Sequence, residues 1–215
     1  MKRSSAARDL SRRRGSATER TRRDILDATM NVIAEYSLSG TTIDRVAAAA
    51  GTAAGSVTLL SMRMYALLVA PLVSCVLLFR AARRAATEGG AEDPAAALRR
   101  LVDLYLDPEL ASASRISVWY AFWGEAGARR VYLDRVAQAD REELAVLVEL
   151  FGLMIARGGH RHLDAEATAK AFFGLREFIW QDIMAEGDRI DRAAARHLIY
   201  RYLAGLFPEE FAGDA

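Results

Sequence analysis

The sequence predicts an all-α protein, with an N-terminal domain of three helices followed by a larger C-terminal helical domain. Apolar side chains recur at helical spacing along most of the 215 residues, and the composition is rich in alanine, leucine and arginine with only 4 prolines. These abundant residue types lose little side-chain freedom in a helix. No segment alternates apolar and polar residues as a half-buried strand would.

Charge is distributed unevenly along the chain. Residues 1–23 carry nine basic and two acidic side chains, a net charge of +7, whereas the whole chain carries only +1. The remainder is therefore acidic, at −6. A basic arm before an acidic body suits a polyanionic partner such as DNA, although a solvated tail has the same composition. We expect residues 1–16 to form a disordered basic arm.

Several classes of protein are disfavoured by simple counts. The single Cys75 excludes an intramolecular disulfide and a cluster of thiolate metal ligands, and it fits a reducing cytoplasm. The first charges are not followed by the apolar stretch of a secretory signal. The uncharged run from Met64 to Phe79 has 16 residues, fewer than the roughly 20 that span a bilayer. We therefore expect no membrane partner.

The first four helices are predicted from periodicity, capping residues and glycines. Thr41 to Asp44 has the form of a capping box, and Gly51 suits the left-handed conformation that ends a helix. Pro71 lies inside the fourth segment, where it removes one backbone hydrogen bond. The predicted helices span about 18–36, 43–50, 54–60 and 62–86.

The second half of the chain contains five further predicted helices. Asp93-Pro94 and Asp107-Pro108 each resemble an N-cap followed by proline in the first helical position. Gly158-Gly159 ends the third of these helices and Gly187-Asp188 separates the last two. Their expected ranges are 94–106, 108–127, 129–157, 164–186 and 191–207.

Two short helices joined at Gly51, after a longer helix, form a helix-turn-helix. We assign residues 17–64 to this domain and residues 65–210 to a helical ligand-binding and dimerisation domain. We expect Ala47, Ala50 and Gly55 where the helices cross. Small polar and methyl groups on the second short helix can contact base edges and thymine methyls. The candidate DNA-binding residues are Arg22, Arg23, Thr42, Arg45, Thr52, Ala53, Ser56, Val57, Thr58 and Arg63.

Four segments of this region resemble the DNA-binding domain of the TetR family: Arg22–Thr29, Thr42–Ala47, Ala50-Gly51 and Gly55–Val57. In the second half, Trp119-Tyr-Ala-Phe-Trp123 and Glu177-Phe-Ile-Trp-Gln181 resemble its BetI-like branch. The resemblance implies a cytoplasmic, homodimeric, ligand-responsive transcriptional regulator without a cofactor, a repressor released from its operator by a small molecule. It further implies a cationic effector, a quaternary ammonium compound.

The sequence departs from the family pattern directly after the second short helix. Where family members usually carry Tyr-Phe-x-x-Lys, this chain has Leu60, Ser61 and Met64. Arg63 offers a cation one residue before the usual lysine. An alternative is therefore a TetR-like protein that binds a ligand or partner but has weakened or lost operator binding.

Aromatic residues of the second half suggest an effector pocket, because aromatic faces attract cations. Trp119, Phe122 and Trp123 share one helical face, although such a stripe also suits an apolar core. The candidate ligand-binding residues are Trp119, Phe122, Trp123, Phe151, Glu177 and Trp180. The last two helices carry more apolar surface than one face buries, and the family uses them for dimerisation. The candidate dimer residues are Phe172, Leu175, Ile179, Ile183, Leu198 and Tyr202.

An enzyme is the rival class, and the sequence disfavours it. His160 and His162 lie beside a glycine pair without cysteine partners, so we expect no metal site there. His197 is the third histidine. Neither a phosphate-binding loop nor a nucleophile elbow is present. We expect no catalytic residues.

Overall fold

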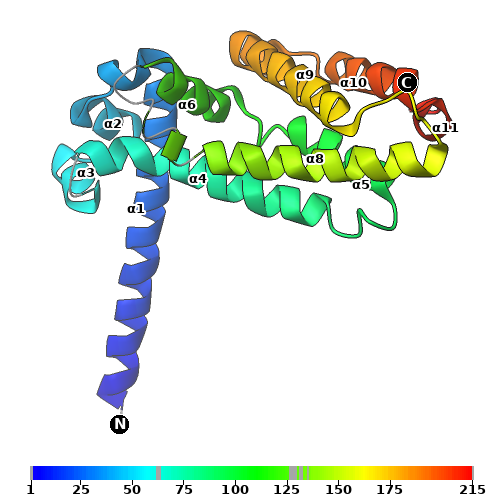
Figure 1. The fold of residues 1–215 in the computed structure, drawn as a ribbon. Coiled ribbons are helices and arrows are strands. Elements are labelled where there is room, and N and C mark those ends of the chain that lie inside the picture. The colour runs from blue at the N-terminus through cyan, green and yellow to red at the C-terminus, as the bar shows by residue number, and fades with distance from the viewer. Residues whose placement is uncertain (1, 62–63, 126–129, 131–132, 135, 215) are drawn as a thin grey trace. The chain divides into compact units, whose positions relative to one another are not determined.

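The computed structural model describes residues 2–61, 64–125, 130, 133–134 and 136–214 (Figure 1). Side chains are described from Thr18 onward, apart from residues 60–65 and 188 and the gaps between these ranges. The described residues form helices and connecting turns and include no strand, which confirms the all-α prediction. The chain divides into two compact units, Met1–Leu72 and Val73–Ala215. The division falls inside a helix rather than at the expected boundary near residue 64.

Figure 1 labels the helices, whose bounds are as follows. The N-terminal unit contains α1 (Lys2–Gly40), α2 (Ile43–Ala49), α3 (Ala54–Ser61) and the first part of α4 (Met64–Ala86). The C-terminal unit contains the rest of α4, α5 (Pro94–Tyr105), α6 (Ala113–Gly124), α8 (Ala137–Gly158), α9 (Ala165–Glu186), the 3-10 turn η1 (Gly187–Arg189), α10 (Arg192–Leu206) and α11 (Pro208–Phe211).

Helix α1 is longer than predicted at both ends. It begins at Lys2, so the residues expected to form a disordered arm are helical. Residues 2–14 are rich in arginine, alanine and other helix-forming residues and include neither proline nor glycine, so nothing in that stretch interrupts a helix. At the other end, Ser37 has a non-helical backbone (φ 61°, ψ 179°), and Thr41 Oγ1 donates to the Ser37 carbonyl at 2.7 Å. The expected break after Tyr36 is therefore a kink.

The N-terminal unit has the predicted three-helix core. Thr42, not Thr41, is the N-cap of α2, and its side-chain oxygen accepts from the amide of Arg45 at 3.3 Å. Gly51 lies in the left-handed region at φ +60°, as its place after α2 predicts. The buried cluster contains Ile25, Ala28, Val32, Val46, Ala47, Val57 and Leu67. Its members come from α1, α2, α3 and α4, so apolar packing holds the short helices in place.

Of the two Asp-Pro pairs, one begins a helix and the other does not. Asp93 is the N-cap of α5 and accepts from the amide of Ala96 at 2.9 Å. Asp107 instead accepts from the amides of Glu109 and Leu110, and this interaction closes a turn. Helix α6 starts later, after the N-cap Ser112. The expected helix at 108–127 is therefore shorter, because Asp107 satisfies the amides of a turn instead of capping a helix.

In the C-terminal unit, α8 packs against α5 and α9, and α6 packs against α9. Tyr105, Leu147, Phe151 and Phe172 lie in its apolar core. Among the described residues, one helical segment, Ala66–Ala86, is long and apolar enough to cross a membrane, with a hydropathy of 1.8 over its most apolar stretch. A core helix of a globular domain has the same length and composition, and 44% of this stretch is buried inside the protein.

Candidate DNA-binding surface and effector pocket

Four of the predicted contact residues are accessible, two of them in α3 and two, Thr52 and Ala53, in the turn before it. Ala53, which precedes α3, and Thr58 are exposed, whereas Thr52 and Ser56 are half-buried. Val57 is fully buried in the core of the N-terminal unit and has no surface to offer a base. Its assignment as a DNA contact is therefore corrected to a packing role, because it faces α1 and α2 rather than solvent.

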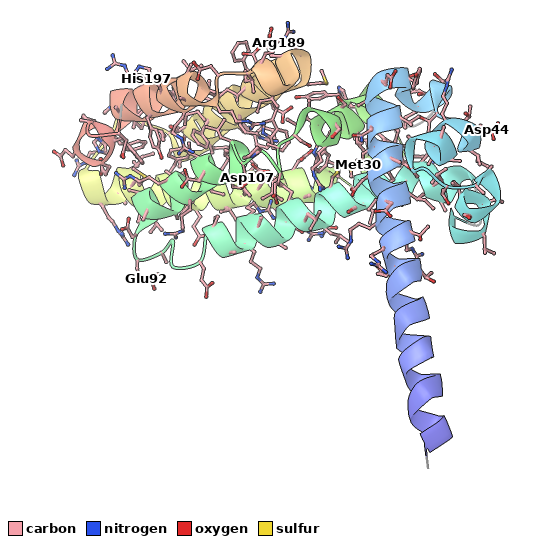
Figure 2. All side chains as sticks on the ribbon, turned by 180° about the vertical axis from the view of Figure 1, so that it is seen from behind. Met30, Asp44, Glu92, Asp107, Arg189 and His197 are labelled. Carbon is pink, nitrogen blue, oxygen red and sulfur yellow. The ribbon has the colours of Figure 1, made fainter. Side chains whose placement is uncertain are left out.

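The remaining predicted contacts lie on α1 and α2. Arg22 and Arg23 are exposed on α1. Arg45 is exposed on α2, near the labelled Asp44 in Figure 2, and its guanidinium lies 4.2 Å from the centroid of the Tyr36 ring while donating to the Gly40 carbonyl. Thr42 also remains exposed. Arg63 lies outside the described residues.

Two residues of α3 differ from the sequence prediction: Gly55 was expected at the helix crossing, and Leu59 was not predicted as a surface residue. Gly55 is exposed, and a Cβ atom built on it would meet no atom within 4 Å, so it does not lie where helices cross. Leu59 is 78% exposed, the highest value among the large apolar side chains that the structure describes. Helical geometry could have identified both, because 100° per residue places them opposite the buried Val57.

A cavity of about 340 Å³ lies within the C-terminal unit. Trp119, Trp123, Glu177 and Trp180 line it, as predicted for the effector site. We call it the aromatic pocket. The side chains that line it are those of Phe79, Trp119, Tyr120, Trp123, Leu133, Ala137, Ala139, Asp140, Glu143, Phe173, Arg176, Glu177, Trp180 and Gln181. All three tryptophans of the chain therefore line this one cavity.

Two predicted ligand residues do not line the pocket. Phe122 is 2% exposed and is not among the lining residues, although it shares a helical face with Trp119 and Trp123. Phe151 is fully buried and packs against Phe172 and Phe207, with ring centroids 5.5 and 5.8 Å away. Both are therefore packing residues. The aromatic face of α6 contributes Trp119 and Trp123 to the cavity, but Phe122 is buried.

Sequence reasoning missed a buried charged group in the pocket. Arg176 is 4% exposed, and its guanidinium carbon lies 4.2 Å from the ring centroids of both Phe173 and Trp180. Its Nη1 lies 3.0 Å from Glu177 and its Nη2 lies 3.7 Å from Glu143. Arginine at position 176 was visible in the sequence, but only the fold shows it turned toward the core.

Two tyrosines complete this charged group. Tyr105 donates to Glu143 at 2.7 Å and Tyr120 donates to Glu177 at 2.8 Å. Burial, and then the neighbouring Glu177 carboxylate, raise the pKa of Tyr120 to about 12. Burial and Glu143 raise the pKa of Tyr105 well above its usual value. Both hydroxyls therefore stay protonated near neutral pH and remain hydrogen-bond donors.

Among the described residues, side chains of both charges line the pocket. Asp140, Glu143 and Glu177 contribute three carboxylates, and Arg176 contributes one guanidinium. The Nε and Nη2 atoms of Arg176 are buried without a hydrogen-bond partner, although Nη2 is ion-paired.

The predicted dimer residues divide into buried and accessible sets. Phe172, Ile179 and Ile183 are at most 2% exposed within the single chain, so they pack inside their own unit and cannot contact a partner. Leu175 and Tyr202 are half-buried, and Leu198 is 43% exposed. The apolar faces of α9 that suggested a dimer interface are therefore covered largely by the chain's own core.

The accessible face of α9 lies elsewhere on the same helix. Six exposed residues recur at spacings of four and three along one face: Ala167, Ala171, Gly174, Phe178, Gln181 and Ala185. Glu166, Lys170, Met184 and Glu186 are also exposed on this helix. On α10 the equivalent exposed residues are Ala194, Leu198, Arg201 and Gly205. This spacing is typical of helices that pack against other helices.

The histidines do not form a site with other potential ligands. His160 packs on the Phe207 ring at 5.2 Å between centroids, and His197 is exposed on α10 (Figure 2). Within the ranges that the structure describes, no three histidine, cysteine, aspartate or glutamate side chains are grouped as a metal ion requires.

Together these features define a helix-turn-helix protein with a separate helical ligand-binding unit. A sequence profile of BetI-type transcriptional repressor C-terminal domains matches residues 94–208, and a profile of bacterial regulatory proteins of the tetR family matches residues 25–59. The chain belongs to the TetR family, in its BetI-type branch. It is a ligand-responsive, DNA-binding transcriptional regulator, as the sequence predicted.

Relatives and solved structures agree with this assignment. The chain is 26% identical to the HTH-type transcriptional regulator BetI of Escherichia coli O17:K52:H18 over 197 residues, which cover 88% of this chain and 95% of that protein. It is also 26% identical to BetI 2 of Chromohalobacter salexigens, over 86% of this chain and 87% of that one. A transcriptional regulator structure from Pseudomonas aeruginosa PAO1 matches with a TM-score of 0.68 at 19% identity, covering 92% and 95% of the two chains.

A further solved structure with this fold contains a small molecule and DNA together. AibR in complex with isovaleryl coenzyme A and operator DNA matches with a TM-score of 0.64 at 20% identity. The match covers 87% of this chain and 98% of AibR.

Proposed function

We propose that two copies of this chain bind a palindromic operator in the cytoplasm through α2 and α3, and that a small molecule in the aromatic pocket releases them. The observation that carries this proposal is the helix-turn-helix itself, with Gly51 in the left-handed turn and the outer side of α3 exposed. The exposed Arg22 and Arg23 on α1 supply cations for phosphate contacts. AibR provides a precedent for one fold binding operator DNA and an effector.

The effector in this proposal is cationic. Glu143 and Glu177 place carboxylates in a lining that also holds three tryptophan rings, and aromatic faces attract cations. Phenyltrimethylammonium is a suitable probe, and tert-butylbenzene is its neutral isostere. Because all three tryptophans line the pocket, quenching of intrinsic fluorescence reports binding there directly. The expected result is saturable quenching by the cation only; equal quenching by both compounds would overturn the choice of a cation.

We expect the exposed faces of α9 and α10 to form the homodimer interface. Phe178→Glu places a charge on a residue that is 53% exposed in the single chain, so the fold should survive while the dimer dissociates. Light scattering should give twice the 23.6 kDa chain mass for the wild type and about the chain mass for the variant. Lys170→Glu, on the same helix beside Glu166, is the matched surface control and should stay dimeric. A wild type that is monomeric at micromolar concentration would contradict this interface.

The basic N-terminal segment should contribute affinity without sequence preference. Deleting residues 1–16 removes six basic side chains and one acidic one. Affinity should fall for every duplex, and the slope of log affinity against log salt should become shallower, because fewer counterions are released. Fluorescence anisotropy at several salt concentrations measures both quantities. An unchanged slope would show that the segment does not contact phosphates.

Departure from the family pattern at Leu60, Ser61 and Met64 favours one second candidate, a TetR-like protein that binds a ligand or partner and has lost operator contacts. The two candidates separate when the wild type is compared with a Leu60→Tyr, Ser61→Phe, Met64→Lys variant. DNA binding by the wild type supports the regulator. Binding by the variant alone supports the second candidate, and binding by neither contradicts both a present and a past operator-binding role.

A further inference from the structure

The outer face of α3 has an unusual pair of residues at its centre. With 100° per residue, Gly55 and Leu59 lie opposite the buried Val57, and Ser56 and Thr58 flank them. In a helix-turn-helix this is the face that enters the major groove. The chemistry of these four positions therefore determines how α3 can read a base sequence.

Packing of the described residues does not require a glycine at position 55. Its conformation is helical, and a Cβ atom at this position would meet nothing within 4 Å. Glycine in a helix lowers stability relative to alanine, so the residue is locally unfavourable. Glycine also permits the closest approach of a helix backbone to another surface. Within the described part of the chain no atom approaches this position, so it is open to close approach by a partner surface.

Leu59 is likewise open to solvent in the described structure. It is 78% exposed, one helical turn after Gly55 and on the same side of the helix. A large apolar side chain at the centre of a DNA-facing surface has one complementary group in the major groove, the C5-methyl of thymine.

Side chains that make bidentate hydrogen bonds to bases are absent from this segment of the sequence. Residues 52–61 read Thr-Ala-Ala-Gly-Ser-Val-Thr-Leu-Leu-Ser, without arginine, lysine, asparagine, glutamine or an acid. The hydroxyl of Thr58 donates to the Ala54 carbonyl at 3.0 Å, which leaves its methyl group as an outward-facing contact. The usual pairs of arginine with guanine and of asparagine with adenine are therefore not available to α3.

We propose that α3 reads its operator through thymine methyl groups, with Leu59 as the specificity-determining residue and Gly55 permitting the backbone to lie close to the groove floor. The inference rests on the proposed operator binding. It adds that preference among sequences comes from apolar contact and shape, not from hydrogen-bond donors on this helix.

The test uses the duplex that the full-length protein enriches from a randomised library. Each thymine of the enriched site is replaced in turn by deoxyuridine, which removes only the methyl group. One or two positions per half-site should lose about four-fold in affinity, the effect of exposing one methyl-sized apolar group. If no position changes affinity by as much as two-fold, the inference fails although operator binding stands. If no duplex is enriched, the proposed function fails first.

Substitutions in the protein provide an independent test of the same proposal. Leu59→Ala should lower affinity for the enriched duplex about ten-fold and should abolish the loss caused by deoxyuridine at one position. Leu77→Ala, which truncates a leucine that is 59% exposed in the C-terminal unit, is the matched control and should change neither quantity. If Leu59→Ala leaves the deoxyuridine effect intact at every position, Leu59 is not the reading residue.

Gly55→Ala should move stability and affinity in opposite directions. The variant should unfold at a higher temperature, because alanine favours the helix and meets no clash within the chain. Its affinity for the enriched duplex should fall at least five-fold, because the added methyl holds the helix away from the groove. A stabilised variant with unchanged affinity would show that no surface approaches Gly55 closely.

Discussion

Replacing Arg176 with methionine is expected to lower the free energy of unfolding of the C-terminal unit by about 3–5 kcal/mol. Arg176 is 4% exposed and lies between the rings of Phe173 and Trp180. Methionine fills a similar volume but leaves Glu143, 3% exposed, without its guanidinium partner. The loss comes mainly from this uncompensated buried carboxylate, because a buried charge without a partner is far less stable than a buried pair.

Urea unfolding followed by tryptophan fluorescence isolates this effect, because all three tryptophans lie in the C-terminal unit. A Glu143→Gln change added to Arg176→Met should recover part of the loss, since glutamine still accepts from Tyr105 and carries no charge. Lys170→Met, which removes an exposed ion pair with Glu166 on the same helix, should not measurably change stability. If Arg176→Met lowers the free energy of unfolding no more than Lys170→Met does, the pair of Arg176 with Glu143 does not stabilise the fold.

Val57→Asp is expected to unfold the N-terminal unit and to abolish DNA binding. Val57 is fully buried against α1 and α2, and an aspartate there would place an unpaired charge in an apolar core, a loss of several kcal/mol. Circular dichroism should show lost helix content, and amide hydrogen exchange should accelerate across α1 to α3. Tryptophan fluorescence should keep its native spectrum, because the tryptophans belong to the other unit.

Thr58→Asp is the matched control for this substitution. Thr58 is the next residue along α3 and is exposed, so the same charge should leave helix content and hydrogen exchange unchanged. Its DNA affinity should nevertheless fall, because a carboxylate on this surface repels phosphates. If Val57→Asp retained both its fold and its DNA binding, Val57 would not be the core residue of the helix-turn-helix.

Much of the fold was predictable because local signals and packing agree. Gly51, Asp93 and the apolar period of α1 each predict a feature that the structure contains. Predictions failed where a side chain had two plausible partners. Asp107 closes a turn instead of capping a helix, since its oxygen reaches the amides of Glu109 and Leu110 equally well.

The candidate sites were predicted less completely, because a helical period shows which residues share a face but not what covers it. Phe172, Ile179 and Ile183 share a face that the chain's own core covers, and Phe178 lies on the face that remains exposed. Arg176 was missed because arginine is rarely buried, and only tertiary packing brings Glu143 and Glu177 to it. Leu59 was missed because Val57, which lies opposite it on α3, was assigned to the DNA-facing surface instead of the core.

Selection from a randomised duplex library, carried out in parallel with the wild type, Val57→Asp and Thr58→Asp, tests most directly whether the helix-turn-helix reads an operator. The wild type should enrich an inverted repeat whose half-sites lie about one DNA turn, or a multiple of it, apart. The Val57→Asp protein should enrich nothing, and Thr58→Asp should enrich the same repeat more weakly. If the wild type enriches no sequence, or if Val57→Asp enriches the repeat equally well, the helix-turn-helix does not read an operator.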